Sequence, residues 1–358
     1  MSKIQWTQQT WNPILGCTQI IGNSQELSGC HNCYAMRQAY RNQAMGLRGY
    51  QGLVKKTSQR EIVWTGKVNL VPEALMKPLQ RQKPTTWFVN SMSDLFHESV
   101  SFEMVDLIFG IMALSQQHTF QVLTKRPLRM LEWTEQTHRD DWCNALVQYA
   151  PSGVSKLVTG TTNLDVAIRH PGFPLPNVWL GVSVESQSAA DERIPLLLET
   201  PASQRFLSCE PLLESVDLTT IKCLDGGLTQ PGVEFNPGQP LGTFDALRAG
   251  ISWGIVGGES GHYARPCSLD WIRHLVRQFK VAGIPIFVKQ LGTDWAKSSG
   301  TYSQNSKGGD PEVWEPDLRI REFPVTGRSH TWVKEFICDD TSPILRKNSD
   351  DSEFRLDY

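Results

Sequence analysis

The sequence has no large excess of charge of either sign and no long apolar run. Its 358 residues contain 35 Lys and Arg against 37 Asp and Glu. The chain is therefore not a polycation that covers nucleic acid with its whole surface, and any such contact must come from a local patch. No apolar run approaches the length of a membrane span, and the first ten residues lack the apolar core of a secretion signal. We therefore expect a cytoplasmic protein that does not contact a membrane.

Cysteine is also scarce, with eight residues spread over the chain. This number is too small for a disulfide scaffold in a chain of this length. In a reducing compartment, thiols indicate a metal site, catalysis or simple burial. Three of the eight, Cys17, Cys30 and Cys33, lie in one loop (residues 11–34) with the spacing C-x12-C-x2-C.

These three cysteines predict a metal site with one open coordination position. Three protein thiolates leave a fourth position free, which a metal needs if it is to take part in chemistry. The sequence predicts a helix over residues 34–45, directly after Cys33. The N–H groups and the positive dipole end of a helix N-terminus stabilise thiolates and anionic clusters.

Three interpretations of the thiols stay open from the residues alone. A structural zinc site needs four ligands, and His31 is poorly placed to be the fourth, so a distant residue would have to complete the site. Simple burial without a metal is the second interpretation. The third is a 4Fe–4S cluster whose open iron binds the amino and carboxylate groups of S-adenosylmethionine, so that electron transfer gives a 5′-deoxyadenosyl radical.

Short apolar segments alternate with helical patterns through the middle of the chain, which indicates βα units and a parallel sheet. We expect one strand before or at the cysteine loop and helices over 101–116, 137–149, through 194–198 and after Ser268. No Gly-x-Gly-x-x-Gly opens a helix after the first strand, which argues against an open dinucleotide-binding sheet. The pattern favours an α/β fold with a full or partial (β/α) barrel and loop insertions. Six further strands are predicted, over residues 87–90, 120–123, 178–184, 205–208, 251–256 and 284–288.

A charged residue follows each of these six strands at its C-terminal end. In a barrel these ends meet at one face, which is the face where such folds carry their chemistry. We therefore expect the six side chains to lie at one mouth: Asp94, Lys125, Glu185, Glu210, Glu259 and Lys289.

The composition divides the chain into three parts. Residues 1–295 form the predicted barrel domain, including the cluster loop 11–34 and a lid-like segment over 219–250. Residues 296–338 form an extension that we expect to pack on the barrel through Trp314 and Phe323. The acidic segment 339–358 is predicted to be a flexible tail.

Basic residues are concentrated between residues 34 and 67, where Glu61 is the only acidic residue. A solvated helix face and a contact for the phosphates of nucleic acid both explain this bias. The candidates for the contact are Arg37, Arg41, Arg48, Lys55, Lys56 and Arg60.

Several motifs together carry a family resemblance. They are WNP-x-x-GC…GC-x-x-CYA around the cysteines, VNSMSDLFHE (89–98), VLTKRP (122–127), WLGVSVE (179–185), RFLSCEPLL (205–213), GIVGGESG (254–261) and DLRIREFP (317–324). Over roughly residues 4–325 the chain resembles an uncharacterised family of phage- and plasmid-borne proteins related to radical S-adenosylmethionine (SAM) enzymes. Members are often encoded beside three-Cys-motif partner proteins, and the family is distantly similar to spore photoproduct lyase, which acts on DNA.

The resemblance implies a barrel of the radical SAM type, with Cys17, Cys30 and Cys33 as ligands of a 4Fe–4S cluster. The chain departs from the common C-x3-C-x2-C pattern by an insertion over 19–27, and Asn32 replaces the usual aromatic residue. By the resemblance, Lys125 and Arg126 either meet the SAM carboxylate or pair with a neighbouring glutamate. The residues implied to bind SAM are Tyr34, Asn90, Ser91, Ser93, Asp94, Lys125, Gly257, Gly258 and Glu259.

Four side chains are candidates for catalysis. Glu185 and Glu210 are expected at the mouth, Cys209 either donates a hydrogen atom or is buried, and His97 either donates a proton or is structural. The leading hypothesis is an enzyme that cleaves SAM with an electron from a reductant protein and acts on a nucleic acid or nucleotide. The alternatives are a non-catalytic nucleic-acid-binding protein with a structural zinc and a barrel enzyme whose cluster is only structural.

Overall fold

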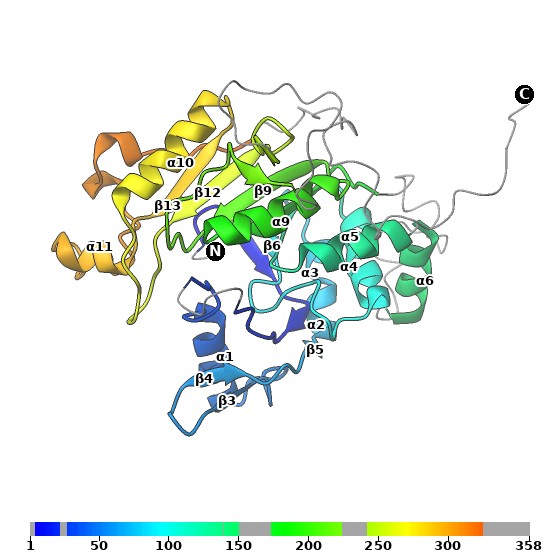
Figure 1. Ribbon diagram of the computed structural model, residues 1–358. Coiled ribbons are helices and arrows are strands. Elements are labelled where there is room, and N and C mark those ends of the chain that lie inside the picture. The colour runs from blue at the N-terminus through cyan, green and yellow to red at the C-terminus, as the bar shows by residue number, and fades with distance from the viewer. Residues whose placement is uncertain (1–3, 22–26, 138, 150–172, 224–241, 325–358) are drawn as a thin grey trace, which may run out of the picture.

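A seven-stranded parallel sheet forms the centre of the protein (Figure 1). The computed structural model describes residues 4–21, 27–137, 139–149, 173–223 and 242–324. The strands lie in the sheet in chain order, and each pairs in parallel with its neighbour. They are β1 (Gln9–Trp11), β6 (Thr86–Val89), β7 (Thr119–Thr124), β8 (Val178–Ser183), β9 (Gln204–Cys209), β12 (Trp253–Gly257) and β13 (Ile286–Gln290).

The sheet curls into a half-barrel and does not close, since β1 and β13 are its two edges in the described part of the chain. The predicted partial (β/α) barrel is therefore confirmed in its coarse form, and the full barrel is wrong. All six later strands lie within two residues of their predicted positions, and β1 is the expected strand before the cysteine loop.

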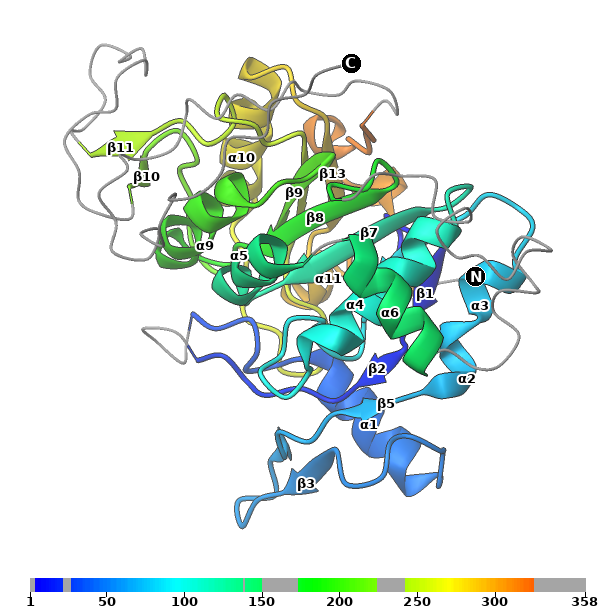
Figure 2. The same cartoon turned by 90° about the vertical axis from the view of Figure 1, so that its right-hand side faces the viewer.

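Helices cover one face of the sheet. Figure 2 shows four of them, α4 (Phe102–Leu114), α5 (Pro127–Gln136), α6 (Arg139–Tyr149) and α9 (Gln187–Glu199), in front of β7 and β8. Another helix, α10 (Leu269–Val281), begins as predicted at Ser268, whose hydroxyl accepts a hydrogen bond from the N–H of Asp270. None of the described helices has both the length and the apolar composition to cross a bilayer.

Side chains alternate between the two faces along each strand, as the strand period of two requires. On β9, Leu207 and Cys209 lie in the helix-side core, whereas Phe206 points to the concave face. Aromatic rings pack on this concave face, with Trp6 and Phe88 only 4.6 Å apart between ring centroids. The rings occupy the inside of the half-barrel, so the space for a ligand lies at the C-terminal ends of the strands.

The segment that carries the cysteines packs at this C-terminal edge. It contains β2 (Ile14–Leu15), α1 (Tyr34–Ala44), a hairpin of β3 (Val54–Lys56) and β4 (Ile62–Trp64), and β5 (Asn69–Leu70), which pairs with β2. Two short helices, α2 (Pro72–Leu75) and α3 (Lys77–Gln80), lead back to the sheet. A second, smaller core joins these elements, with Leu15, Met36 and Trp64 among its buried members.

The last described residues pack along the edge strand β13. After α11 (Thr293–Ser298) the chain forms two 3-10 turns, η1 (Pro311–Val313) and η2 (Pro316–Leu318). Trp314 is buried, and the ring of Phe323 lies 5.5 Å from that of Trp253. Two short strands, β10 (Ile221–Lys222) and β11 (Thr243–Phe244), pair at the ends of the predicted lid. Residues 224–241 of the predicted lid and the tail lie outside the described residues.

Candidate iron–sulfur and ligand site

The three thiols of the cysteine loop lie close enough to influence one another's charge. Burial, and after it the charges of Asp94, Cys30 and Cys33, raise the pKa of Cys17 to about 12, although Arg126 lowers it. Burial and then Cys30 likewise raise the pKa of Cys33. A thiol in such surroundings ionises only if a cation neutralises it. Cys17 and Cys33 are therefore suited to bind positive charge and unsuited to exist as free thiolates.

The spacing of these thiols differs from that of a single-ion site. In the described ranges, no group of three or more His, Cys, Asp or Glu side chains is placed to hold one metal ion. Thiolates of an iron–sulfur cluster bind different irons, so they stand farther apart than the ligands of one ion.

Cys33 lies at the N-terminal end of α1. Burial raises its pKa, as noted, but the backbone N–H groups of Ala35 and Met36 hydrogen-bond its sulfur and lower the pKa, as does the ammonium of Lys125. These donors face the position at which a thiolate or an anionic cluster would lie. The predicted helix is therefore confirmed, and Cys33 lies at its N-terminus as expected.

Glu185, at the end of β8, binds the loop between Cys17 and Cys30. Its Oε1 accepts hydrogen bonds from the Gly29 N–H (3.3 Å) and from Lys125 Nζ (2.6 Å), and its Oε2 from Arg193 Nη1 (2.9 Å). Burial alone would raise the pKa of Glu185, but Lys125 and Arg193 lower it to about 2. A carboxylate with so low a pKa is a poor proton acceptor, so Glu185 acts as a positioning residue for the loop.

Glu259, just beyond β12, binds the other side of the loop. It pairs with Arg265 through both oxygens, at 2.6 Å and 3.0 Å, and accepts a hydrogen bond from Asn32 Nδ2 at 3.1 Å. Arg265 in turn donates to the carbonyl of Ser28 at 3.1 Å. Asn32 stands where an aromatic residue was expected, and its amide links the cysteine loop to the sheet.

Gly258, beside this carboxylate, fits only as glycine. A Cβ on it would lie 2.4 Å from the carbonyl oxygen of Leu291. Gly257 is less tightly placed, with its nearest neighbour, the Gln290 carbonyl oxygen, 3.1 Å from such a Cβ. The Gly-Gly-Glu element therefore joins β12 closely to the residues after β13.

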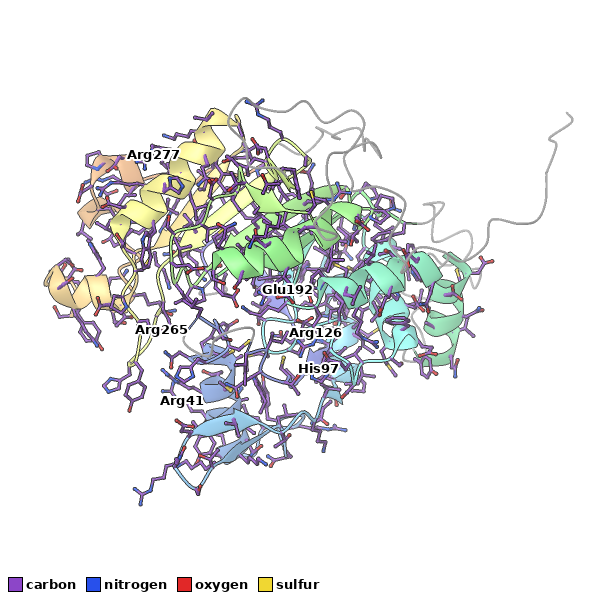
Figure 3. All side chains as sticks on the ribbon, viewed as in Figure 1. Arg41, His97, Arg126, Glu192, Arg265 and Arg277 are labelled. Carbon is purple, nitrogen blue, oxygen red and sulfur yellow. The ribbon has the colours of Figure 1, made fainter. Side chains whose placement is uncertain are left out.

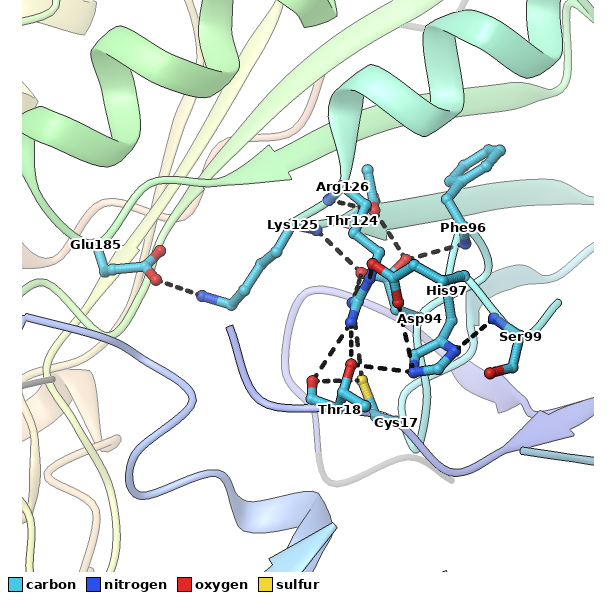
Figure 4. Close-up of polar contacts among 11 residues, drawn as sticks. Cys17, Thr18, Asp94, Phe96, His97, Ser99, Thr124, Lys125, Arg126 and Glu185 are labelled. Atoms are coloured by element: carbon cyan, nitrogen blue, oxygen red, sulfur yellow. Dashed lines mark hydrogen bonds and ion pairs between the residues drawn. The ribbon is translucent and has the colours of Figure 1, made fainter. Parts of the chain in front are cut away.

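A buried polar network lies beside Cys17 (Figure 4). Asp94 accepts hydrogen bonds from Thr124 Oγ1 (2.8 Å) and Arg126 Nη1 (3.1 Å), which link the ends of β6 and β7. Arg126 also donates to Thr18 Oγ1 at 2.6 Å, and its Nη1 lies 3.9 Å from the Cys17 sulfur. Every oxygen of Asp94 already has protein partners, so its side chain stabilises this network and presents no free group to a ligand.

His97 belongs to the same network (Figures 3 and 4). It is 1% exposed. Its Nδ1 accepts a hydrogen bond from the Ser99 N–H (3.0 Å), so Nε2 carries the proton and donates to Thr18 Oγ1 at 3.1 Å. Burial and then Arg126 lower its pKa. The structure supports the structural interpretation of His97.

A cavity of about 200 Å³ opens at the C-terminal ends of the strands, and we call it the inner cavity. Cys33 lines this cavity, whereas Cys17 and Cys30 are not among its described lining residues. Lys125 and Tyr34 also line it, and Tyr34 donates its hydroxyl to the Ser91 carbonyl at 2.7 Å. The opposite wall consists of Ser208, Glu210, Gly258, Glu259, Lys289 and Gln290.

Glu210 is the predicted catalytic residue that faces the inner cavity. Its Oε2 pairs with Lys289 Nζ at 2.6 Å, and its Oε1 accepts from Trp6 Nε1 at 3.1 Å. Of the two interpretations of Cys209, the structure supports burial, since the residue is 1% exposed. Its side chain lies in the helix-side core, because neighbouring residues on β9 point to opposite faces, and burial raises its pKa.

The residues predicted to bind the SAM amino group lie in a tight turn after β6. The Ser91 hydroxyl donates to Asn12 Oδ1 and the Ser93 hydroxyl to the Ile14 carbonyl. Asn90 has a φ of +56°, and its Nδ2 is buried without a partner in the described structure. Among the described lining residues of the inner cavity, none comes from this turn.

Three residues of the site were not predicted from the sequence: Arg193, Arg265 and Thr18. Arg193 lies within α9 and Arg265 in a loop, where no spacing pattern marks them. Thr18 follows Cys17 directly, and this adjacency was the one available signal.

A family model matches residues 1–324, which include every residue of the site. The chain belongs to the family described as protein of unknown function DUF5131. None of the curated proteins and none of the solved structures matches it. In this DUF5131 protein the matched region ends where the described residues end, after the packed part of the C-terminal extension.

Proposed function

We propose that this DUF5131 protein is a radical SAM-type iron–sulfur enzyme that acts on a nucleic acid or a nucleotide. The observation that carries the proposal is the position of the three mutually interacting thiols at the C-terminal edge of a parallel half-barrel, where Cys33 lines the inner cavity. The family resemblance of the sequence motifs points to the same chemistry.

The residues present suit a 4Fe–4S cluster. Thiolates are the ligands that such clusters prefer, and backbone N–H groups hydrogen-bond their sulfurs. Cys17, Cys30 and Cys33 would hold it, with the N–H groups of Ala35 and Met36 directed at the Cys33 sulfur. When bound, a cluster with an open iron supplies one electron to SAM, which breaks a carbon–sulfur bond of the sulfonium to give methionine and a 5′-deoxyadenosyl radical.

The chain's own residues prepare the inner cavity for this cofactor. Lys125 lies at its wall as a cation suited to the SAM carboxylate, although Glu185 already binds its ammonium. Glu210 and Glu259 add negative charge to the wall that would face the cationic amino and sulfonium groups, although Lys289 and Arg265 already pair with these carboxylates. Tyr34 presents an aromatic ring on which adenine can stack. The apolar rings deeper in the half-barrel limit water around the reacting atoms.

Anaerobic purification with iron analysis tests the proposal. We expect a brown protein with about four irons per chain. With SAM and a one-electron reductant, it should release 5′-deoxyadenosine, and Cys17→Ala, Cys30→Ala or Cys33→Ala should abolish this release. Cys209→Ala is the matched control, since its thiol lies in the helix-side core and should not be needed.

Two results would replace the proposal. A colourless protein with one zinc per chain indicates a non-catalytic zinc protein. A brown protein that never releases 5′-deoxyadenosine indicates a cluster with a purely structural role.

A further inference from the structure

A second cavity of about 560 Å³ lies beside the inner cavity, and we call it the side cavity. Residues from α1, from the loop 260–262 and from the segment 302–309 line it. Its described lining contains four basic side chains, Arg37, Arg41, Lys289 and Lys307, and no Asp or Glu. Lys289 already pairs with Glu210 of the inner cavity, so Arg37, Arg41 and Lys307 give the side cavity its positive charge. A concave surface with this imbalance concentrates positive potential and favours an anionic ligand.

The arrangement of the arginines on α1 supports this interpretation. Arg37 and Arg41 are four residues apart, so their side chains lie on the same helix face and repel each other. No acidic residue occurs in the first turn of α1 to offset them. Arg37 is oriented by Tyr263, whose ring centroid lies 5.6 Å from its guanidinium carbon. A bound anion would relieve the repulsion between the two guanidinium groups.

Neutral hydrogen-bond donors complete the side cavity. The amides of Gln5, Gln38 and Asn305 and the hydroxyl of Tyr302 all contribute to its lining. Guanidinium groups together with amide and hydroxyl donors are the groups that bind phosphate oxygens in nucleic-acid complexes.

The side cavity and the inner cavity share a wall. Tyr34, Ser260, Lys289 and Gln290 line both. The shared wall lies at the open side of the half-barrel, since Lys289 and Gln290 belong to the edge strand β13. A group bound in the side cavity is therefore next to the space beside Cys33.

We propose that the side cavity binds a phosphate group of the substrate and thereby positions the neighbouring nucleoside at the inner cavity. The phosphate belongs either to a single-stranded nucleic acid or to a free nucleotide. The reaction of the positioned nucleoside rests on the proposed function, but the binding of the phosphate itself requires neither the cluster nor SAM.

Fluorescence anisotropy with a short fluorescein-labelled single-stranded DNA tests the inference on the full chain. Arg41→Gln combined with Lys307→Gln should weaken binding about tenfold. The slope of log K against log salt should fall by about 0.7 for each phosphate that the variant no longer neutralises. Competition by thymidine monophosphate identifies a free nucleotide as the source, and its failure to compete identifies nucleic acid.

Arg48→Gln combined with Lys55→Gln is the matched control, because these basic residues come from the same segment but do not line the side cavity. It should change the affinity less than twofold. Equal weakening by both pairs, or by neither, would overturn the side cavity as the binding site.

The Cys30→Ala protein separates the two proposals. If it still binds DNA and responds to Arg41→Gln with Lys307→Gln, the phosphate site stands whatever the iron analysis gives. If the wild type releases 5′-deoxyadenosine but the side-cavity variants bind DNA normally, the proposed function stands and this inference fails.

Discussion

The two ends of the cysteine loop are held in different ways. Beside Cys17, Asp94, Arg126 and His97 form a network that is buried on all sides. Beside Cys30 and Cys33, two carboxylates bind the loop from the sheet side, and Cys33 still lines the inner cavity. The first end anchors the loop, and the second places it accurately while leaving one side accessible. Substitutions at the first end should consequently affect stability most, and those at the second end ligand binding.

The largest effect should follow Asp94→Ala. It leaves Arg126 as a buried cation without its main partner, which costs about 3–5 kcal/mol in the free energy of unfolding. Urea denaturation measures the loss. Glu98→Gln is the control, because Glu98 also pairs with Arg126 but its side chain is 65% exposed, and should cost less than about 1 kcal/mol. Equal losses would show that the network does not anchor the loop.

Glu185→Gln should change the pH dependence of stability. The folded-state pKa of about 2 lies below the ordinary value of 4.5, so the carboxylate stabilises the fold above pH 4.5 and loses this contribution as the pH falls through 2. The shift corresponds to about 3 kcal/mol. The difference in unfolding free energy between wild type and variant should therefore shrink over this window.

The exposed Glu192, one residue before Arg193 on α9, provides the comparison for that experiment. The unfolding free energy of the Glu192→Gln variant, plotted against pH, should run parallel to that of the wild type from pH 5 to pH 2. If the unfolding free energy of the Glu185→Gln variant also ran parallel to that of the wild type, the pairing of Glu185 with Lys125 and Arg193 would be contradicted.

Glu259→Gln should have a moderate effect on stability. It weakens the hydrogen bonds that Glu259 accepts from Arg265 and Asn32, both of which are partly exposed, at a cost of about 1–3 kcal/mol. The loop then becomes less ordered, so anaerobically purified protein should retain less iron. Arg273→Gln breaks the ion pairs that link α10 to Glu315 and Asp317, and it should leave the iron content unchanged.

The smallest effect on stability should come from Tyr34→Phe. The hydroxyl makes one hydrogen bond, to the Ser91 carbonyl, and Tyr34 is 52% exposed, so the loss should be about 0.5–1 kcal/mol. Thermal unfolding checks the value. If Tyr34→Phe lowered the unfolding free energy as much as Asp94→Ala, the end of the loop beside Cys33 would contribute as much to stability as the end beside Cys17. The contrast between the two ends would then be wrong.

The strands of the sheet could be predicted because buried parallel strands are continuous apolar runs. The segment 178–184 became β8 at Val178–Ser183 for this reason. The β3–β4 hairpin was missed, since Lys55 and Lys56 are exposed and its short strands show little apolar alternation.

The sequence predicted where the site lies in the fold, but not which residues of the site contact one another. A charge after each strand indicated which edge of the sheet is polar, and Glu210 and Lys289 do lie there. The pairing of Glu185 with Gly29, 156 residues away, depends on how distant segments pack, and no local pattern encodes it. The orientation of Cys209 depends on the register of β9, because a shift of the strand by one residue turns every side chain to the opposite face of the sheet.

The long separation between Asn32 and Glu259 also governs the order of events during synthesis. The ribosome completes the cysteine loop first, and the carboxylate that binds it follows 227 residues later. At about 5–20 residues per second, the loop waits for about 10–45 s before this partner exists. During that interval the three thiols are exposed to oxidants and to stray metal ions, so the proposed cluster would be assembled only after the chain has been completed.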